Sequence, residues 1–335
     1  MKSILVAVAA SLLWLNAHAD TVVIRIATVA PPHTAWADYL QQINDAWEQV
    51  SNGQVQLKIY AGTLGDEGDI MRRIRIGQID AATVSTTGLA TVDRAATALH
   101  IPLAFSSYQE IDYVRDHISG QIDQVLREKG IVVLNWGEGG WVRFFSDTPI
   151  QYPDDLKKQR MFVWSTGDTS QAEEIWKSLG VNPVPLSSVD ILPALQTGMI
   201  TAYQAPPLLA LANQWFAFTK FMTDMRWAPL LGASVISTRA WARVPAELRP
   251  KLLQAAREAG RALDRKVRMQ EQQAIDAMVK RGLKLVPISA EALKAWEKFT
   301  LAVYPEIRGK IVPAKYFDEA LRLRDEYRAT HAKAD

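Results

Sequence analysis

The sequence predicts an α/β protein made of two similar lobes that face each other across a cleft. Apolar-periodic segments follow the order strand–helix–strand–helix–strand in residues 22–85, and the same order recurs in residues 155–208. A third observation is a helical pattern at about 245–281, which at about 1.5 Å per residue is roughly 55 Å long. This exceeds the length of one lobe, so we expect the helix to lie across both, with Pro250 or Gly260 as the position of any kink.

The first half contains the elements of one lobe. A β-branched run at residues 22–29 predicts a strand, and the helix that follows has apolar residues at three- and four-residue intervals and ends before Gly53. Strict alternation at residues 54–60 predicts a second strand. The next helix ends at Gly77, and residues 81–85 form a short buried strand. Strands joined by helices in this way predict a parallel sheet.

The second half repeats this arrangement. A strand-like run at residues 160–164 precedes an amphipathic helix that ends at Gly180. A strand punctuated by prolines at residues 181–186 leads to a helix closed by Gly198, and a third strand follows at residues 200–204. Because parallel strands joined by right-handed crossovers end at the same edge, this unit is expected to frame one side of a crevice.

The remaining segments complete the two lobes. They comprise helices at residues 110–129, 290–303 and 314–329 and strands at residues 131–136 and 230–237. We expect a first lobe and a second lobe that the chain enters twice each: residues 20–144 plus about 229–270, and residues 145–228 plus about 271–335.

Composition excludes several classes of function. The formal net charge of +2 gives nucleic-acid binding no electrostatic support. The absence of cysteine excludes disulfides, thiol nucleophiles, iron–sulfur clusters, cysteine-ligated zinc and a lipoprotein anchor. With 335 residues, the chain is long enough to bury a core without crosslinks.

The N-terminus predicts export. Lys2 supplies a positive charge, residues 4–15 are apolar, and Ala17-His18-Ala19 matches a cleavage site. The apolar stretch is shorter than the roughly 20 residues that a membrane span needs. We therefore expect residues 1–19 to be a cleaved secretory signal peptide and the mature protein to be exported and soluble.

Catalytic motifs are scarce. The four histidines outside the signal peptide lack metal-ligand spacing, and no nucleophile elbow, zinc-protease motif, P-loop or dinucleotide-binding motif occurs. The acidic pairs Asp154-Asp155 and Glu173-Glu174 are most simply solvated surface. We predict that the protein is no enzyme and uses neither a cofactor nor a metal.

Aromatic residues point to a ligand cleft. Trp136, Trp141 and Trp164 lie at strand ends or in loops, where the cleft of a two-lobe protein is expected, and Phe105 and Trp215 are candidates to join them. Pockets for small ligands are mostly apolar, so this enrichment fits such a site. The alternative is that each is an ordinary core or hinge aromatic.

Several runs of the sequence resemble one family. They are IRIATVAPPHTAW, LGDEGDIMRRIRIGQIDAATVST, IPLAFSSYQE, DDLKKQRMFVW, SLGVNPVPLSSVDILPALQTGMITAYQAP and the S-T-x-x-W run at residues 237–241. In this order they resemble the dicarboxylate-type solute-binding proteins of tripartite ATP-independent periplasmic (TRAP) transporters. The resemblance covers nearly all of the chain after residue 19.

This resemblance implies a fold and a role. It implies an α/β, two-lobe periplasmic binding protein fold with a hinge, a central cleft and a long lobe-spanning helix. Such proteins reside in the periplasm and capture a small organic acid. They then deliver it to TRAP membrane subunits driven by an ion gradient. For this chain we expect a monomer without a cofactor.

The expected ligand-facing positions depart from the family pattern. The family places an arginine, which clamps the ligand carboxylate, where this chain has Phe162, and a proline where it has Trp164. A second family arginine corresponds to Val142, and an asparagine corresponds to Ala205. Three polar contacts are thus replaced by apolar side chains.

Two interpretations of these departures compete. In the favoured one the cleft is apolar and aromatic, because an unpaired carboxylate there would cost several kcal/mol. In the other, Arg143 or Arg160 acts as a displaced clamp. A one-residue offset along a strand points Arg143 away from the cleft unless a bulge intervenes, and Arg160 lies two residues before Phe162.

The sequence therefore predicts a ligand site from both lobes. We expect the second-lobe side and its flank to be lined by Phe162, Trp164, Val142, Trp141, Ala205 and Phe105, with Arg143 or Arg160 in the alternative. Polar contacts from the first lobe are expected from Glu67, Ser85, Thr86 and Thr87. Two other functions remain as hypotheses, a carrier of hydrophobic compounds without a dedicated transporter and, least favoured, a periplasmic enzyme.

Overall fold

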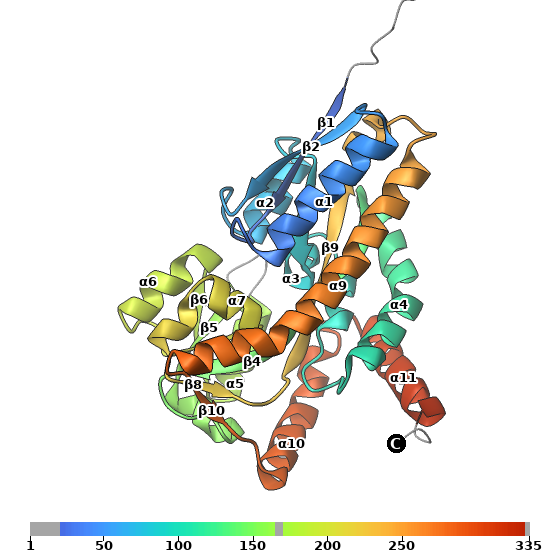
Figure 1. The fold of residues 1–335 in the computed structure, drawn as a ribbon. Coiled ribbons are helices and arrows are strands. Elements are labelled where there is room, and N and C mark those ends of the chain that lie inside the picture. The colour runs from blue at the N-terminus through green and yellow to red at the C-terminus, as the bar shows by residue number, and fades with distance from the viewer. Residues whose placement is uncertain (1–20, 165–169, 332–335) are drawn as a thin grey trace, which may run out of the picture.

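The computed structural model describes residues 21–164 and 170–331 (Figure 1). The expected signal peptide, residues 1–19, lies outside the described residues. The strands are β1 (Val22–Thr28), β2 (Val55–Ala61), β3 (Ala81–Ser85), β4 (Ile131–Ser146), β5 (Arg160–Trp164), β6 (Asn182–Leu186), β7 (Ala202–Ala205), β8 (Phe221–Thr223), β9 (Ala228–Ser237) and β10 (Lys284–Val286). The α-helices are α1 (Ala35–Val50), α2 (Glu67–Arg75), α3 (Thr86–Ala90), α4 (Tyr108–Glu128), α5 (Ser170–Ser178), α6 (Ile191–Gln196), α7 (Pro207–Ala212), α8 (Thr238–Arg243), α9 (Arg249–Lys280), α10 (Ala290–Ile307) and α11 (Ala314–His331), and the 3-10 helix η1 covers Arg94–Leu99.

The first half of the chain forms the predicted parallel sheet. β2 pairs with β1 and β1 with β3, all in parallel. Helix α1 starts where the Thr34 side chain accepts a hydrogen bond from the Ala37 amide, and its buried face carries Tyr39, Leu40, Ile43 and Trp47. These side chains pack with β1 residues and with α9 in one core cluster, so the apolar periodicity of the sequence sets the layer order.

The second half forms its own parallel set. β5 pairs in parallel with β6 and with β7, and β5 occupies the residues predicted for it, 160–164. Its middle residues are buried, and Phe162 packs with Ile191 of α6 and Tyr203 of β7. The predicted α/β architecture is therefore confirmed in both halves.

Two long strands join the halves into one sheet, ordered β2-β1-β3-β9-β4-β7-β5-β6. β4 pairs antiparallel with β9 from Ile131 to Val142 and then with β7 from Arg143 to Ser146. The predicted strand at 131–136 thus continues to Ser146, because β9 pairs with it along most of its length. A register irregularity lies between Glu138 and Gly140, and Gly140 has a φ of 102°, so this is where β4 bends between the lobes.

Helix α9 is one continuous helix from Arg249 to Lys280. Figure 1 shows it running beside α1 in one lobe and on toward the other. Pro250 lies in its first turn, where the missing amide hydrogen is tolerated. A Cβ at Gly260 would lie 2.5 Å from Asn135 Nδ2, so this glycine allows close contact with β4. Neither residue divides the helix, because its bounds run through both positions.

The C-terminal helices contact both halves. Trp296 of α10 stacks on Phe144 of β4 at a ring separation of 5.5 Å. By contrast, α11 packs along α4, and Phe317 shares a core cluster with first-half residues such as Ile118 (Figure 1). We expected residues 271–335 in the second lobe, and α11 instead contacts first-lobe elements because its buried face matches the apolar face of α4.

No helix among the described residues is long and apolar enough to cross a lipid bilayer.

Candidate functional site

The cleft between the lobes contains two adjoining cavities. Chamber 1 lies between β1, β3, β9 and β4 on one side and β5, β7 and α7 on the other, with a volume of about 150 Å³. Chamber 2 lies among α3, η1, β5, α5 and α10, with a volume of about 270 Å³. Thr87, His100, Trp164 and Gln204 line both chambers, and we call these four residues the neck.

A chain of neutral hydrogen bonds forms the first-lobe wall of chamber 1. The Tyr39 hydroxyl donates to Asn135 Oδ1 and lies 2.8 Å from Ser234 Oγ, which lies 2.6 Å from Thr83 Oγ1. Burial raises the pKa of Tyr39, so its hydroxyl stays protonated at neutral pH. The wall therefore offers polar atoms without charge.

Glu67 lines chamber 1, but its carboxylate is used within the first lobe. It accepts hydrogen bonds from the Ser85 amide at 2.7 Å and from the Ser85 hydroxyl at 2.6 Å. Burial raises the pKa of Glu67 despite these bonds. The structure brings the predicted residues Glu67, Ser85 and Thr87 to chamber 1 and Thr86 to chamber 2, where they surround the start of α3.

The second-lobe wall of chamber 1 is apolar except at Gln204 of β7. Val142 of β4, Ala205 of β7 and Trp164 of β5 line it. Phe162 has only 1% of its surface exposed and lies outside both linings. It packs edge-on against Trp164 with ring centroids 5.0 Å apart, so it supports a lining residue from behind.

Other aromatic candidates lie away from the chambers. Trp141 precedes Val142 on β4, so its side chain leaves the opposite face of the strand, where it packs on Tyr108. Phe105 lines a separate surface cavity. Trp136 donates to Asp123, and Trp215 packs on Tyr203 in the second-lobe core.

Both candidate arginine clamps are occupied elsewhere. Arg143 Nη1 lies 2.6 Å from Asp224 Oδ1, and Nη2 lies 3.5 Å from Glu271 Oε1. Arg160 Nε donates to the Gly198 carbonyl at 3.0 Å, at the end of α6. Neither side chain is among those that line chamber 1 or chamber 2.

Sequence reasoning missed two residues of the neck. His100 Nδ1 lies 2.7 Å from the Pro229 carbonyl oxygen, and burial lowers the pKa of the imidazole. The ring is therefore neutral, Nδ1 donates its hydrogen to that carbonyl, and Nε2 is left as an acceptor. Gln204 Oε1 is buried without a hydrogen-bond partner among the described residues. A lone histidine and a strand glutamine carry no spacing pattern, so only the fold could bring them together.

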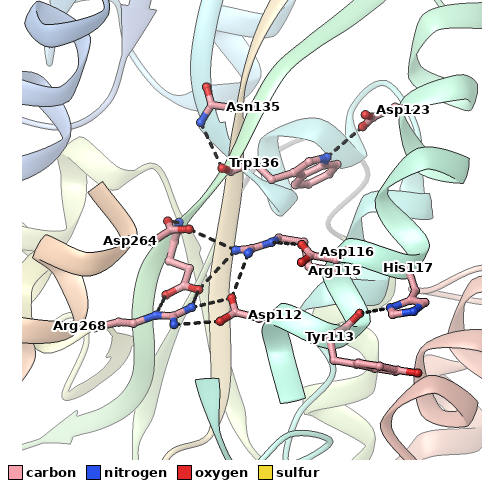
Figure 2. Close-up of polar contacts among 11 residues, drawn as sticks. Asp112, Tyr113, Arg115, Asp116, His117, Asp123, Asn135, Trp136, Asp264 and Arg268 are labelled. Atoms are coloured by element: carbon pink, nitrogen blue, oxygen red, sulfur yellow. Dashed lines mark hydrogen bonds and ion pairs between the residues drawn. The ribbon is translucent and has the colours of Figure 1, made fainter. Parts of the chain in front are cut away.

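A cluster of buried and half-buried charges lies beside chamber 1, and Figure 2 shows its contacts. We call Asp112, Arg115, Glu138, Asp264 and Arg268 the charge cluster. Arg268 Nε donates to Glu138 at 2.9 Å and Nη1 to Asp112 at 2.9 Å, while Arg115 Nη1 donates to Asp264 at 3.2 Å. Burial raises the pKa of Asp264 to about 7, with the nearby Glu138 adding to the rise. The cluster joins α4, β4 and α9 at the bend of β4.

No group of three or more histidine, aspartate or glutamate side chains within residues 21–164 and 170–331 is arranged to hold a metal ion.

Fold and cleft together define a two-lobe binding protein. Residues 26–310 match the family model described as bacterial extracellular solute-binding protein, family 7, and the chain belongs to this family. Its members are substrate-binding proteins of transport systems that bind small molecules and deliver them to membrane subunits. The TRAP resemblance found in the sequence is thereby confirmed.

Known relatives are similar over most of their length. The chain is 25% identical over 251 residues to the 2,3-diketo-L-gulonate-binding periplasmic protein YiaO of Escherichia coli K12, covering 73% of this chain and 75% of that protein. It is 23% identical over 299 residues to the C4-dicarboxylate-binding periplasmic protein DctP of Rhodobacter capsulatus, covering 88% and 89%. The crystal structure of the sugar acid binding protein DctPAm of Advenella mimigardefordensis with galactonate superposes with a TM-score of 0.85 at 17% identity, covering 92% and 99%, which shows a common fold.

Proposed function

We propose that this chain is a periplasmic solute-binding protein of a TRAP-type uptake system whose cleft takes an uncharged, apolar or aromatic ligand. The proposal rests on one observation: among the described residues, no arginine or lysine lines chamber 1. The segment at residues 165–169 contains neither residue type in its sequence.

The charges that do line chamber 1 oppose an anionic ligand. Both are carboxyl groups, Glu67 and Glu138, and each is paired within the protein. His100 is neutral, because its pKa is lowered by burial. A carboxylate in the chamber would therefore lose its hydration without gaining a cation, at a cost of several kcal/mol.

The relatives named above bind acids, so an uncharged ligand would set this chain apart from them. DctP of R. capsulatus binds C4-dicarboxylates and DctPAm was crystallised with galactonate. At the positions that the family resemblance assigns to polar ligand contacts, this chain places Val142 and Ala205 in the lining and Phe162 directly behind it. The scaffold supports solute binding, and its lining supports a different class of solute.

The remaining parts of the proposal follow from the sequence. Residues 1–19 act as the cleaved signal peptide, and the mature chain works as a monomer without catalysis. The two lobes, with the boundaries predicted above except that α11 joins the first lobe, close on the ligand by bending where β4 changes partner. The closed state delivers the ligand to the membrane subunits of the transporter.

A thermal-shift and calorimetry comparison tests the proposal. We expect neutral probes such as benzyl alcohol and 1-octanol to raise the melting temperature of the purified protein by mass action, and succinate and galactonate to leave it unchanged. Stabilisation by succinate or galactonate that is lost in Arg143→Ala or Arg160→Ala would overturn the proposal and establish a displaced clamp.

Ala205→Asn provides a matched variant. It restores the amide that the family places at this position and adds little volume to the wall of chamber 1. We expect it to weaken binding of the neutral probes by severalfold, because it introduces a polar group that they do not pair. Unchanged binding in this variant would show that the probes occupy another part of the protein.

A further inference from the structure

Chamber 2 is an apolar cavity that the proposed function of chamber 1 leaves unused. Its volume of about 270 Å³ exceeds the 150 Å³ or so of chamber 1. Its walls carry Ile175, Trp176 and Leu179 of α5 and its following turn, and Phe299 and Val303 of α10. All five are only partly exposed or buried, so the chamber is a preformed apolar space and not a flat surface.

The chambers adjoin at a neck that is polar on one side. Trp164 contributes an indole to both chambers, while His100, Gln204 and Thr87 contribute polar atoms to both. A ligand that passes from one chamber to the other must lie against these side chains. The path is therefore mostly apolar in chamber 2 and polar at the neck, and in chamber 1 it runs between a largely apolar second-lobe wall and a neutral polar first-lobe wall.

The neck offers two acceptors to a ligand, and one of them, the Gln204 oxygen, is buried without a partner in the described part of the chain. His100 Nδ1 is bound to the Pro229 carbonyl, so Nε2 can only accept a hydrogen bond. The side-chain oxygen of Gln204 is buried and unpaired. An unpaired buried acceptor costs about 1–3 kcal/mol, so a ligand that donates a hydrogen bond here recovers that free energy. A carboxylate has no hydrogen to donate to these acceptors and cannot recover this free energy.

We propose that the ligand is an elongated neutral molecule that fills both chambers, with one hydroxyl or N–H group at the neck and an apolar arm on each side. The inference rests on the proposed function and names the class of its substrate. The single hydrogen of the donor group is shared between the two acceptors, His100 Nε2 and the Gln204 oxygen, in a three-centre hydrogen bond. The Trp164 indole packs against the part of the ligand that crosses the neck. Length and the position of the donor group set specificity.

Chamber 2 also has two cations in its lining, Arg94 and Lys310, both exposed. Arg94 donates to the Lys310 carbonyl, and Lys310 pairs with Glu306 on the protein surface. These contacts orient the two cations toward other protein groups. The alternative to a neutral ligand is an amphiphilic acid whose carboxylate lies at the exposed edge of chamber 2, near Arg94 and Lys310.

Calorimetry with the full chain and a series of alcohols tests the inference. The probes are primary alcohols from hexanol to dodecanol and the mid-chain isomer 6-dodecanol. We expect affinity to rise with length by about threefold to fourfold per added methylene up to the capacity of both chambers, as burial of each CH₂ contributes about 0.8 kcal/mol. We expect 6-dodecanol to bind more tightly than 1-dodecanol, because its hydroxyl reaches the neck with an arm on each side.

Variants locate the two arms and the donor group. Ala90→Phe narrows chamber 2. In this variant, affinity should stop rising with alcohol length once the alcohol is longer than chamber 1 can hold. The affinity for hexanol should stay within twofold of wild type. His100→Phe and Gln204→Leu should each weaken 6-dodecanol by about tenfold and leave its methyl ether within twofold. Circular dichroism melting shows whether each variant folds, and Thr63→Val, an exposed position outside the lining of both chambers, is the control.

The outcomes separate this inference from the proposed function. If short neutral probes bind but neither length nor Ala90→Phe changes affinity, the inference fails and the neutral chamber 1 stands. If dodecanoate binds more tightly than the alcohols and loses this advantage in Lys310→Met, the neutral class is wrong for chamber 2. If only succinate and galactonate bind, the proposed function itself fails.

Discussion

Chamber 1 and the charge cluster adjoin on β4. Polar groups form ion pairs in the charge cluster, whereas they form hydrogen bonds between uncharged groups on the first-lobe wall of chamber 1. Glu138 belongs to both, since it lines the chamber and accepts hydrogen bonds from Arg268. In the cluster, three carboxyl groups and two guanidinium groups pair across α4, β4 and α9 (Figure 2). On the chamber side, Tyr39, Asn135 and Ser234 bond to one another without charge.

The two regions differ in whether their charged groups include cations. In the charge cluster, cations and carboxyl groups pair at the junction of the lobes. Chamber 1 presents no cation among the described residues, and its two carboxyl groups are hydrogen-bonded within the protein. A binding cleft for acids would need the reverse arrangement, with a guanidinium group facing the cavity. Variants that remove charges from the charge cluster, or add a charge to chamber 1, test this contrast.

Removing a cation from the charge cluster should have the largest effect on stability. In Arg268→Met, Glu138 and Asp112 lose their shared partner while Glu138 stays buried. We expect the free energy of unfolding to fall by about 3–5 kcal/mol in urea titrations. Arg322→Met, which breaks exposed pairs on α11, is the matched control and should change little. If Arg268→Met and Arg322→Met lowered the free energy of unfolding equally, the charge cluster would have no special role in stability.

Adding a cation to chamber 1 should change its ligand class. In Val142→Arg, a guanidinium group enters a wall that has none among the described residues. We expect affinity for neutral probes to fall by roughly a hundredfold, equal to about 2.7 kcal/mol, and succinate binding to appear in calorimetry. Val142→Met adds comparable length without charge and should leave succinate unbound. Succinate binding by the wild-type protein would remove the basis for the comparison.

Removing one carboxyl group from the charge cluster should alter how stability depends on pH. The pKa of Asp264 is raised to about 7 from an ordinary value of 3.8, so the folded state keeps a proton that the unfolded state loses. Its contribution is present below pH 4 and is lost as the pH rises through about 7, with a slope of at most ~1.4 kcal/mol per pH unit.

The test is urea unfolding of Asp264→Asn and wild type between pH 4 and pH 8. We expect a flatter profile for the variant, because Glu138, Arg115 and Arg268 still face the site but one titrating group is gone. Parallel profiles for the two proteins would show that Asp264 does not titrate in this range.

Breaking the neutral hydrogen bonds of chamber 1 should have the smallest effect. Tyr39→Phe leaves Asn135 Oδ1 and Ser234 Oγ without the phenol. We expect a loss of about 1–2 kcal/mol in the free energy of unfolding, because each lost bond is between uncharged groups. Tyr113→Phe, whose hydroxyl donates to Glu326 on the surface, is the control. A loss larger than that of Arg268→Met would reverse the order that the contrast predicts.

Local patterns predicted much of this structure. The repeated strand–helix order gave β5 its residue bounds and the parallel pairing of both halves, because periodicity reflects which side of an element is buried. Alternation along β4 separated Val142, in the chamber, from Arg143, which pairs with Asp224.

Non-local contacts could not be predicted in this way. The neck takes His100, Trp164 and Gln204 from segments far apart in the chain, and the neutral state of His100 depends on the Pro229 carbonyl. Likewise, the association of α11 with α4 rests on one apolar helix face meeting another, for which the sequence holds no positional rule.

The position of β9 sets an order of assembly for the chain. β9 lies between β3 and β4, although the chain makes it only after the whole of the second parallel set. Until residues 228–237 are available, β3 has an unpaired edge and the first-lobe sheet has a missing strand. The N-terminal segment therefore cannot fold as a finished unit while the rest of the chain is being synthesised, and both lobes reach their native state together.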